Sequence, residues 1–272
     1  MQIPIDKKIK IKDRIYAAFI FFTRLPFWRI YQPTREAYET VVEHWPLVGW
    51  LTGIAMAGTL YLCHLILPLS LSILLAMLVR ILLTGALHED GLADFCDGFG
   101  GGTSREKILS IMKDSHIGTY GVIGLILYEL IFFQTISTIC SITEMKTCIF
   151  AIIGGDAFSK MIAAQIIQFL PYTRNAETAK NGVVYRKLSL KSGISLFVQG
   201  VLPMIPLLYS TGFAHINWII FAPCITMFLL YTLMNKKIGG YTGDCCGAIF
   251  LLCELTFYIA FAGTIYYNIV TI

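Results

Sequence analysis

Four carboxylates stand within nine residues directly behind an apolar stretch, in the segment HEDGLADFCDGFGGG at residues 88–102. Three of them, Asp90, Asp94 and Asp97, are four and three residues apart. In an α-helix, which turns about 100° per residue, this spacing places them on one stripe about 60° wide. Glu89 would lie about 100° off that stripe. Like charges held this close repel one another, and neighbouring apolar surface makes the ionised forms costlier.

A hard divalent cation would relieve this repulsion, because carboxylate oxygens are the ligands that Mg²⁺ prefers. We therefore predict a Mg²⁺ site formed by Asp90, Asp94 and Asp97, with Glu89 as a weaker candidate ligand. An acidic helix end that is merely solvated by water is the alternative interpretation, and it would suffice for a single aspartate.

Glycines follow the last aspartate directly, at Gly98, Gly100, Gly101 and Gly102. Glycine lets a backbone approach a ligand closely and form turns that direct N–H groups at anions. Mg²⁺ beside such a turn is typical of phosphoryl transfer, in which the cation neutralises charge on phosphate oxygens. The sequence therefore predicts that Gly98, Gly100 and Gly101 bind phosphate, with a flexible hinge as the alternative.

Two further segments could complete such a site. Residues 103–121 predict a short amphipathic helix, which would make Arg105 and Lys113 available to phosphates. The segment KKIGGYTGDCCGA repeats the combination of glycines with an acidic residue, at Gly243 and Asp244.

Asp156 and Lys160 lie four residues apart inside an apolar stretch, and therefore on one face of a helix. Ionisable groups inside a membrane are costly and usually face a cavity or each other. The pair could therefore line the phosphate site or form a structural ion pair, and the sequence leaves both open.

The chain that carries these residues is too apolar for a water-soluble protein. Of its 272 residues, 56% are hydrophobic and 14% are charged, and the mean hydropathy is +0.70. Soluble domains carry about 25% charged residues. We therefore predict an all-α, polytopic integral membrane protein.

Seven apolar stretches approach the roughly 20 residues that a helix needs to cross the hydrocarbon layer. They lie at about residues 46–67, 70–87, 118–140, 148–170, 190–211, 216–234 and 247–269. We treat 1–272 as one membrane domain with an N-terminal segment at 1–45 and a catalytic loop at 88–117. If the second span continued as one helix from Ser70 to Gly98, it would be about 43 Å long and would carry the acidic stripe to the membrane boundary.

Basic residues predict the orientation. All but three of the 21 Lys and Arg residues lie in the segments 1–45, 88–117, 171–189 together with Lys191, and 235–246. Because cytoplasmic loops carry the excess of basic residues, we expect the N-terminus and the acidic segment to face the cytoplasm. The sequence IKIKDRIYAAFIFFTRLPFW sets basic beside aromatic residues and predicts an amphipathic helix in the headgroup plane. The net charge of +4 fits this topology and does not indicate nucleic-acid binding.

Three smaller features have structural explanations. The eight cysteines include no C-x-x-C pair, and those in or at the ends of spans, Cys140 and Cys148 among them, should act as small hydrophobic side chains. His88 would point away from the acidic stripe, which favours packing over metal binding. Gly49 and Gly53 belong to a strip of small residues four apart, which predicts close helix packing.

The order of these motifs resembles a known family. HEDGLADFCDG resembles the H-x-D-G-L-A-D-x-x-D-G pattern of cobalamin synthase, the adenosylcobinamide-GDP ribazoletransferase family. Other segments look like landmarks of that family in the same order: FFTRLP at 21–26, WPLVG at 45–49, MKDSHIGTYG at 112–121, the Ser159–Lys160 pair, KNGV from Lys180, and GGYTGDCCGA at 239–248.

The resemblance implies a reaction and a location. Family members are multi-pass proteins, which here implies the cytoplasmic membrane of a prokaryote. They join α-ribazole, or its 5′-phosphate, to adenosylcobinamide-GDP and release GMP, and they require Mg²⁺. The expected partners are therefore these two substrates and the lipid bilayer, with a homo-oligomer or association with other enzymes of the pathway as further options.

The same resemblance implies roles for individual residues. Asp90, Asp94 and Asp97 match the family's metal-binding positions. The matched catalytic candidates are Lys113, Asp114, Ser115, Lys160 and Asp244, and the candidates for substrate or phosphate binding are Gly98, Gly100, Gly101, Arg105, Asp156, Lys180, Asn181 and Gly243. This chain departs from the pattern at Lys160 and His116, where the family commonly has arginine. Lysine keeps the charge but loses the bidentate fork of arginine.

Two other functions fit parts of the sequence. The aspartate spacing is similar to that of CDP-alcohol phosphotransferases, but Asp94 stands where their D-G-x-x-A-R motif has arginine. A cation transporter would also use charged groups inside the membrane. The acidic residues gather at one predicted mouth rather than at the bilayer centre, which disfavours a transporter.

Overall fold

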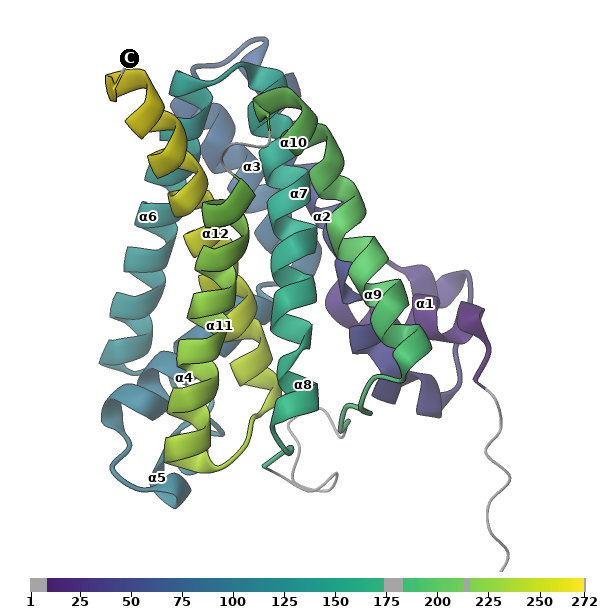
Figure 1. The fold of residues 1–272 in the computed structure, drawn as a ribbon. Helices are drawn as coiled ribbons and strands as arrows, with labels where there is room; N and C mark the ends of the chain where they lie inside the picture. The colour runs from purple at the N-terminus through teal and green to yellow at the C-terminus, as the bar shows by residue number, and fades with distance from the viewer. Residues whose placement is uncertain (1–8, 174–182, 213–215, 272) are drawn as a thin grey trace, which may run out of the picture.

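The computed structural model describes residues 9–173, 183–212 and 216–271, and within them the regular structure is helical (Figure 1). The helices are α1 (Ile11–Phe22), η1 (Phe27–Arg29), η2 (Arg35–His44), α2 (Trp45–His64), α3 (Leu69–Thr84), α4 (Leu87–Gly101), α5 (Arg105–Ile111), α6 (Thr119–Ile142), α7 (Met145–Ala164), α8 (Ile166–Phe169), α9 (Leu190–Val201), η3 (Leu202–Met204), α10 (Ile205–Thr211), α11 (Ile216–Ile238) and α12 (Gly243–Thr271), where η marks a 3₁₀ helix. The predicted all-α class is confirmed.

Within these described ranges, six helical segments are long and apolar enough to cross a membrane. They are Arg35–His64, Thr119–Ile142, Met145–Phe169, Leu190–Thr211, Asn217–Ile238 and Gly243–Thr271. A bent pair, α3 with α4, brings the number to seven if it is one broken span. The prediction of a polytopic bundle with about seven spans is therefore confirmed.

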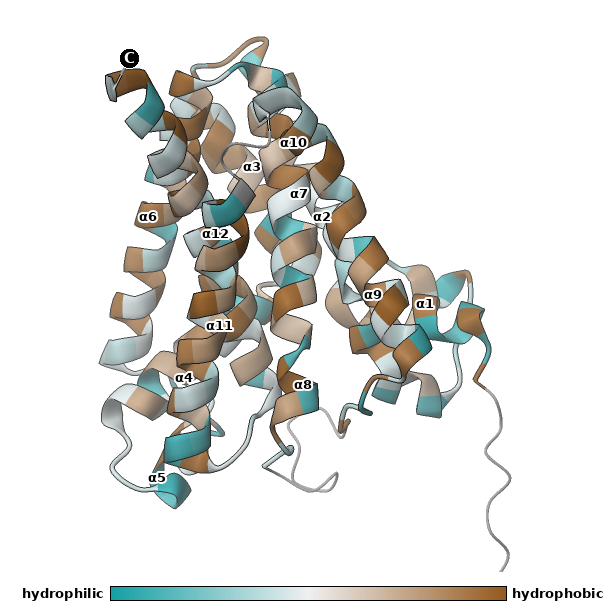
Figure 2. Cartoon of the chain, viewed as in Figure 1, coloured by the Kyte–Doolittle hydropathy of each residue, from teal (hydrophilic) through white to brown (hydrophobic). Residues whose placement is uncertain are grey.

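Two helices form the centre of the bundle. In an apolar stretch of 18 residues within α7, and in one within α12, 78% is buried inside the protein. In the corresponding stretches of α6 and α11 the buried share is 22%. Apolar residues run along all four helices in Figure 2. On α6 and α11 large apolar side chains such as Leu130 and Phe228 are exposed. Such a surface suits contact with lipid tails, which places α6 and α11 at the periphery.

Close packing of α2 on α7 depends on two glycines. A Cβ atom on Gly49 would lie 2.9 Å from the Cα of Ala157, and one on Gly53 would lie 3.0 Å from the Cα of Ile153. Larger residues at these positions would push the helices apart. The packing predicted from the strip of small residues is confirmed.

The predicted continuous helix from Ser70 to Gly98 is wrong, because the chain breaks between α3 and α4 with a bend of 88°. Gly85 and Ala86 both have left-handed backbone angles, with φ of 66° and 57°. The N–H of Ala86 donates to the carbonyl of Ile81 at 3.0 Å, which is the Schellman ending that a glycine favours. As a result α4 crosses the end of the bundle instead of extending α3.

The N-terminal segment forms the predicted helix, α1, which buries Ala17, Ala18 and Phe22. It lies to one side of the bundle, near η2 and the start of α2 (Figure 1). Its placement in a headgroup layer stays a prediction.

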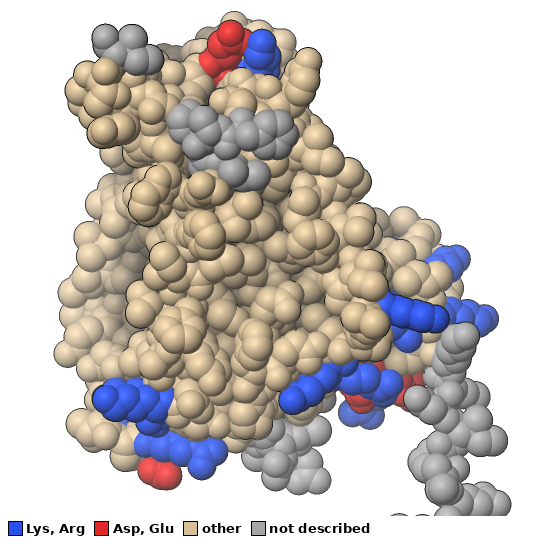
Figure 3. Space-filling model, viewed as in Figure 1, with Lys and Arg blue, Asp and Glu red and all other residues tan. Residues whose placement is uncertain are grey.

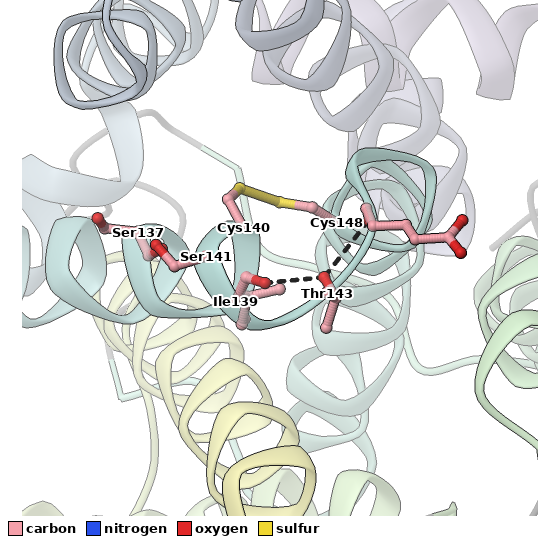
Figure 4. Close-up of a disulfide and its surroundings, with 7 residues drawn as sticks. Ser137, Ile139, Cys140, Ser141, Thr143 and Cys148 are labelled. Atoms are coloured by element: carbon pink, nitrogen blue, oxygen red, sulfur yellow. Dashed lines mark hydrogen bonds between the residues drawn. A yellow bond between two sulfur atoms is a disulfide. The ribbon is translucent and has the colours of Figure 1, made fainter. Parts of the chain in front are cut away.

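The two ends of the bundle differ in charge and in sulfur chemistry. On the face drawn in Figure 3, Lys and Arg gather at the end that holds α5 and over α1, and the broad middle is uncharged. At the opposite end, Cys140 of α6 and Cys148 of α7 form a disulfide beside the α6–α7 turn (Figure 4). The expectation that these two cysteines act only as small hydrophobic side chains is therefore wrong.

Candidate active site

Three carboxylates from two helices meet at the charged end of the bundle. Asp90 and Asp94 of α4 and Asp244 of α12 each offer one oxygen atom, and these three atoms lie within 4.8 Å of one another. Asp90 is exposed and the other two are half-buried, so a ligand can reach the group. We call these residues the carboxylate cluster.

Glycines allow α4 and α12 to approach closely enough to form the cluster. A Cβ atom on Gly91 would lie 2.9 Å from the carbonyl oxygen of Asp244. One on Gly247 would lie 3.2 Å from the backbone of His88. Because side chains are missing at both crossing points, the first turn of α12 rests against α4. Asp244 consequently lies beside two residues that precede it by about 150 positions.

Asp97, the third predicted metal ligand, has a different partner in this structure. Its carboxylate accepts hydrogen bonds from the backbone N–H groups of Gly118 at 2.7 Å and Gly121 at 2.8 Å. These groups belong to the N-terminus of α6, which lacks helical acceptors and favours negative charge. The carboxylate therefore caps α6, and the structure replaces Asp97 by Asp244 in the cluster.

Glu89, the weaker candidate, faces the interior of the bundle. Its side chain is buried, with an oxygen 4.0 Å from Arg80. Arg80 donates to Glu254 at 2.6 Å and to the hydroxyl of Tyr128 at 3.1 Å. These buried groups form an ion-pair network in the interior, separate from the cluster.

The predicted turn of glycines is wrong, whereas phosphate binding by Gly98, Gly100 and Gly101 stays a prediction. Gly98, Gly100 and Gly101 lie inside the last turns of α4, and none has a left-handed φ angle. A Cβ atom on Gly98 would lie 2.4 Å from the Met112 side chain, and one on Gly100 would lie 2.7 Å from the ring of Tyr120. These two glycines serve the packing of α4 against the chain that follows.

Asp156 and Lys160 form the structural ion pair that the sequence left open. Both side chains are buried in α7 and pair with each other. Thr52 donates to Asp156 at 2.8 Å, and the Lys160 ammonium lies 3.8 Å from the ring centre of Phe250. The contacts of the pair are internal, and none reaches the cluster in the described part of the chain.

Four of the remaining predicted residues lie at the same end of the bundle, and the structure shows no hydrogen bond or ion pair between these four described residues and the cluster. Arg105 begins α5, and Lys113, Asp114 and Ser115 lie on the exposed loop before α6. His116 donates to Asp114 through its ring and its backbone N–H, and these hydrogen bonds hold the pKa of Asp114 below its usual value. Lys180 and Asn181 lie outside the described residues.

An aromatic cavity opens next to the cluster, and sequence reasoning missed it. Asp244 and Gly243 form part of its wall, together with Phe21, Trp45 and Tyr185. Burial raises the pKa of the Tyr185 phenol well above its usual value, so the hydroxyl stays protonated and can donate. Phe21 and Trp45 belong to the segments FFTRLP and WPLVG. The resemblance of these segments to the family was therefore the signal in the sequence that could have pointed to the cavity.

His88 confirms its predicted packing role. The side chain is buried, and its ring contacts those of Phe22, Trp45 and Phe250, with centroids 6.1, 5.7 and 4.8 Å away.

Comparison with known proteins gives a consistent result. The family model described as cobalamin-5-phosphate synthase matches residues 14–262. The adenosylcobinamide-GDP ribazoletransferase of Leptospira interrogans is 36% identical, over 91% of this chain and 94% of the relative. Proteins of the same name are 36% identical in Shewanella sp. strain W3-18-1, over 91% and 92%, and 37% identical in Vibrio parahaemolyticus, over 89% of each chain. No solved structure matches the chain.

Proposed function

The chain belongs to the cobalamin-5-phosphate synthase family of cobalamin-synthesising enzymes, and on that premise we propose that it joins α-ribazole, free or as its 5′-phosphate, to adenosylcobinamide-GDP. A hydroxyl of the ribazole attacks the phosphorus on the cobinamide side. The bond from that phosphorus to the oxygen of GMP breaks, GMP leaves, and the hydroxyl proton passes to solvent or a base. The family match along almost the whole chain carries this proposal.

The carboxylate cluster supports a divalent cation, for which we propose Mg²⁺. Three carboxylate oxygens within 4.8 Å of one another are a donor set of the kind that hard cations take, and the exposure of Asp90 leaves room for further ligands. When bound, the ion would neutralise negative charge on the diphosphate. Asp90, Asp94 and Asp244 would hold it.

Other residues of the chain position these groups. Gly91 and Gly247 set the distance between α4 and α12, and Asp97 joins the end of α4 to the start of α6. The aromatic wall beside Asp244 keeps water away from one side of the reacting groups. This arrangement favours transfer to the ribazole hydroxyl over hydrolysis.

We also propose that the cluster faces the cytoplasm, in the cytoplasmic membrane. Basic residues gather at the end that holds it, as the positive-inside rule requires. The disulfide lies at the opposite end, and disulfides persist in oxidising compartments.

In a Cys63→Ser background, an impermeant maleimide added to intact cells should label Cys140 and Cys148 only after reduction. Labelling of Cys96 under the same conditions would reverse the orientation.

The activity is tested with the purified chain in lipid nanodiscs. We expect release of GMP when adenosylcobinamide-GDP, α-ribazole and Mg²⁺ are supplied together, and none when Mg²⁺ is replaced by EDTA. Release of GMP without formation of the cobalamin product would show hydrolysis instead of transfer. Failure to release GMP with either form of ribazole would overturn the proposed function.

A further inference from the structure

A second hollow lies beside the aromatic cavity, and its wall is basic. It has a volume of about 860 Å³, which is within the range of small-molecule sites. We call it the arginine cleft. It lies between α1, η2 and residues 183–186, and its polar lining includes Arg24, Arg35, Tyr38, Glu39, Tyr185 and Arg186.

The positive charges of the cleft are only partly balanced. Glu39, the one carboxylate among the described lining residues, accepts a hydrogen bond from Arg186 at 3.2 Å. Among the described residues, the side chains of Arg24 and Arg35 have neither a hydrogen bond nor an ion pair. Two guanidinium groups are therefore available to a ligand, and guanidinium is well suited to phosphate because it donates in a planar fork.

The fold holds one of these arginines in place. The backbone N–H of Arg24 donates to the carbonyl of Leu83 at 2.8 Å. Its side chain lies across Gly85, where a Cβ atom would be 2.1 Å from the Arg24 Nε. The glycine that breaks α3 from α4 therefore also makes room for Arg24 at the edge of the cleft.

The cleft adjoins the aromatic cavity beside the cluster. Phe21, Leu87, Val183 and Tyr185 line both hollows. Leu87 precedes Asp90 by three residues, which is less than one helical turn. The arginines and the carboxylates therefore lie at two ends of one shared wall, which places two parts of one ligand within reach of both.

We propose that the arginine cleft binds the 5′-phosphate of the phosphorylated acceptor, and this inference rests on the proposed function. The only anionic groups of adenosylcobinamide-GDP are those of the diphosphate, which the reaction requires at the carboxylate cluster. Guanosine and the corrin amides carry no negative charge. A second anion site that lies next to the cluster but outside it thus matches the one other phosphate in the reaction, a dianionic phosphomonoester on the acceptor.

The test compares ribazole 5′-phosphate with unphosphorylated ribazole as acceptor. Arg35→Gln should raise the KM for ribazole 5′-phosphate about 10- to 100-fold, the loss expected for a hydrogen bond to a charged group. The KM values for unphosphorylated ribazole and for adenosylcobinamide-GDP should not change, which shows that the variant is folded. Arg24→Gln is the second variant. Arg29→Gln, which removes the same charge from an exposed position outside the cleft, should match the wild type.

Three results would overturn the inference. In the first, Arg35→Gln changes the KM for both acceptors equally. In the second, it raises the KM for adenosylcobinamide-GDP. In the third, the effect occurs in nanodiscs that contain phosphatidylglycerol but not in phosphatidylcholine alone, which would assign the cleft to a lipid headgroup. In each of these three results the enzyme still turns over. They are therefore distinct from failure of the proposed function, in which neither acceptor yields GMP.

Discussion

The protein holds charged side chains in two regions of opposite design. In the interior of the bundle, Arg80 pairs with Glu254 and Lys160 pairs with Asp156, so each positive charge has a carboxylate partner. At the end of the bundle, the carboxylate cluster brings three like charges together where solvent can reach them.

The difference separates stability from function. Buried charges persist only when they are paired, because desolvation of each ion costs several kcal/mol. A group of like charges at an accessible surface contributes less to folding than a buried pair does, and a bound cation would reduce the repulsion between the carboxylates. Substitutions in the interior should therefore change the free energy of unfolding, whereas substitutions in the cluster should change turnover.

The largest effect is expected at the interior pair. Arg80→Met leaves Glu254 buried without its partner and should lower the free energy of unfolding by about 3–5 kcal/mol. A titration with SDS that follows helix content measures this change.

Two controls make the interior prediction specific. Adding Glu254→Leu to Arg80→Met should restore part of the lost stability, because the apolar pair needs no compensating charge while Glu89 still lies buried near position 80. Lys146→Met breaks the exposed ion pair with Glu144 and should cost no more than about 1 kcal/mol. An Arg80→Met protein as stable as the wild type would remove the distinction between the two regions.

The second prediction concerns the cluster. Asp94→Asn should lower kcat about 10²- to 10³-fold, because one ligand of a charge-neutralising ion supplies several kcal/mol in the transition state. Its stability without Mg²⁺ should match that of the wild type. Mg²⁺ should raise the unfolding temperature of the wild type but not that of the variant. If Asp94→Asn kept full turnover, the cluster would not be the metal site.

Local patterns in the sequence predicted the helices and much of their packing. The apolar stretches located the spans, and the strip at Gly49 and Gly53 predicted the contact between α2 and α7. Periodicity could not show the break at Gly85, because the residues on both sides of it favour a helix. The left-handed ending of α3 was visible only as one glycine after Thr84.

The acidic site shows the same limit. Helical spacing correctly placed Asp90 and Asp94 on one stripe, and the family resemblance brought in Asp244 as an active-site residue. Spacing could not reveal that α12 crosses α4 at Gly91, nor that α6 begins beside Asp97. Both are tertiary contacts between residues that are distant in the sequence. A pattern of neighbouring residues therefore cannot predict them.

A third prediction tests how the cluster is assembled. Gly91→Ala places a methyl group 2.9 Å from the backbone oxygen of Asp244, so α12 must move away from α4. We expect a loss of about 1–3 kcal/mol of stability and a weaker affinity for Mg²⁺. Mg²⁺ titration of the unfolding temperature measures the affinity. Gly58→Ala is the matched control, because a Cβ atom there would meet nothing within 4 Å.

The smallest effect is expected at Asp97, and it separates this residue from its neighbours on the stripe. Asp97→Asn keeps an acceptor for one N–H group of α6 but loses the negative charge at the helix N-terminus, at a cost of about 1 kcal/mol. Because Asp97 lies outside the cluster, stabilisation by Mg²⁺ should be unchanged and kcat should fall less than in Asp94→Asn. If Asp97→Asn instead abolished the Mg²⁺ effect without loss of stability, the original aspartate stripe, and not the crossing of α4 with α12, would define the metal site.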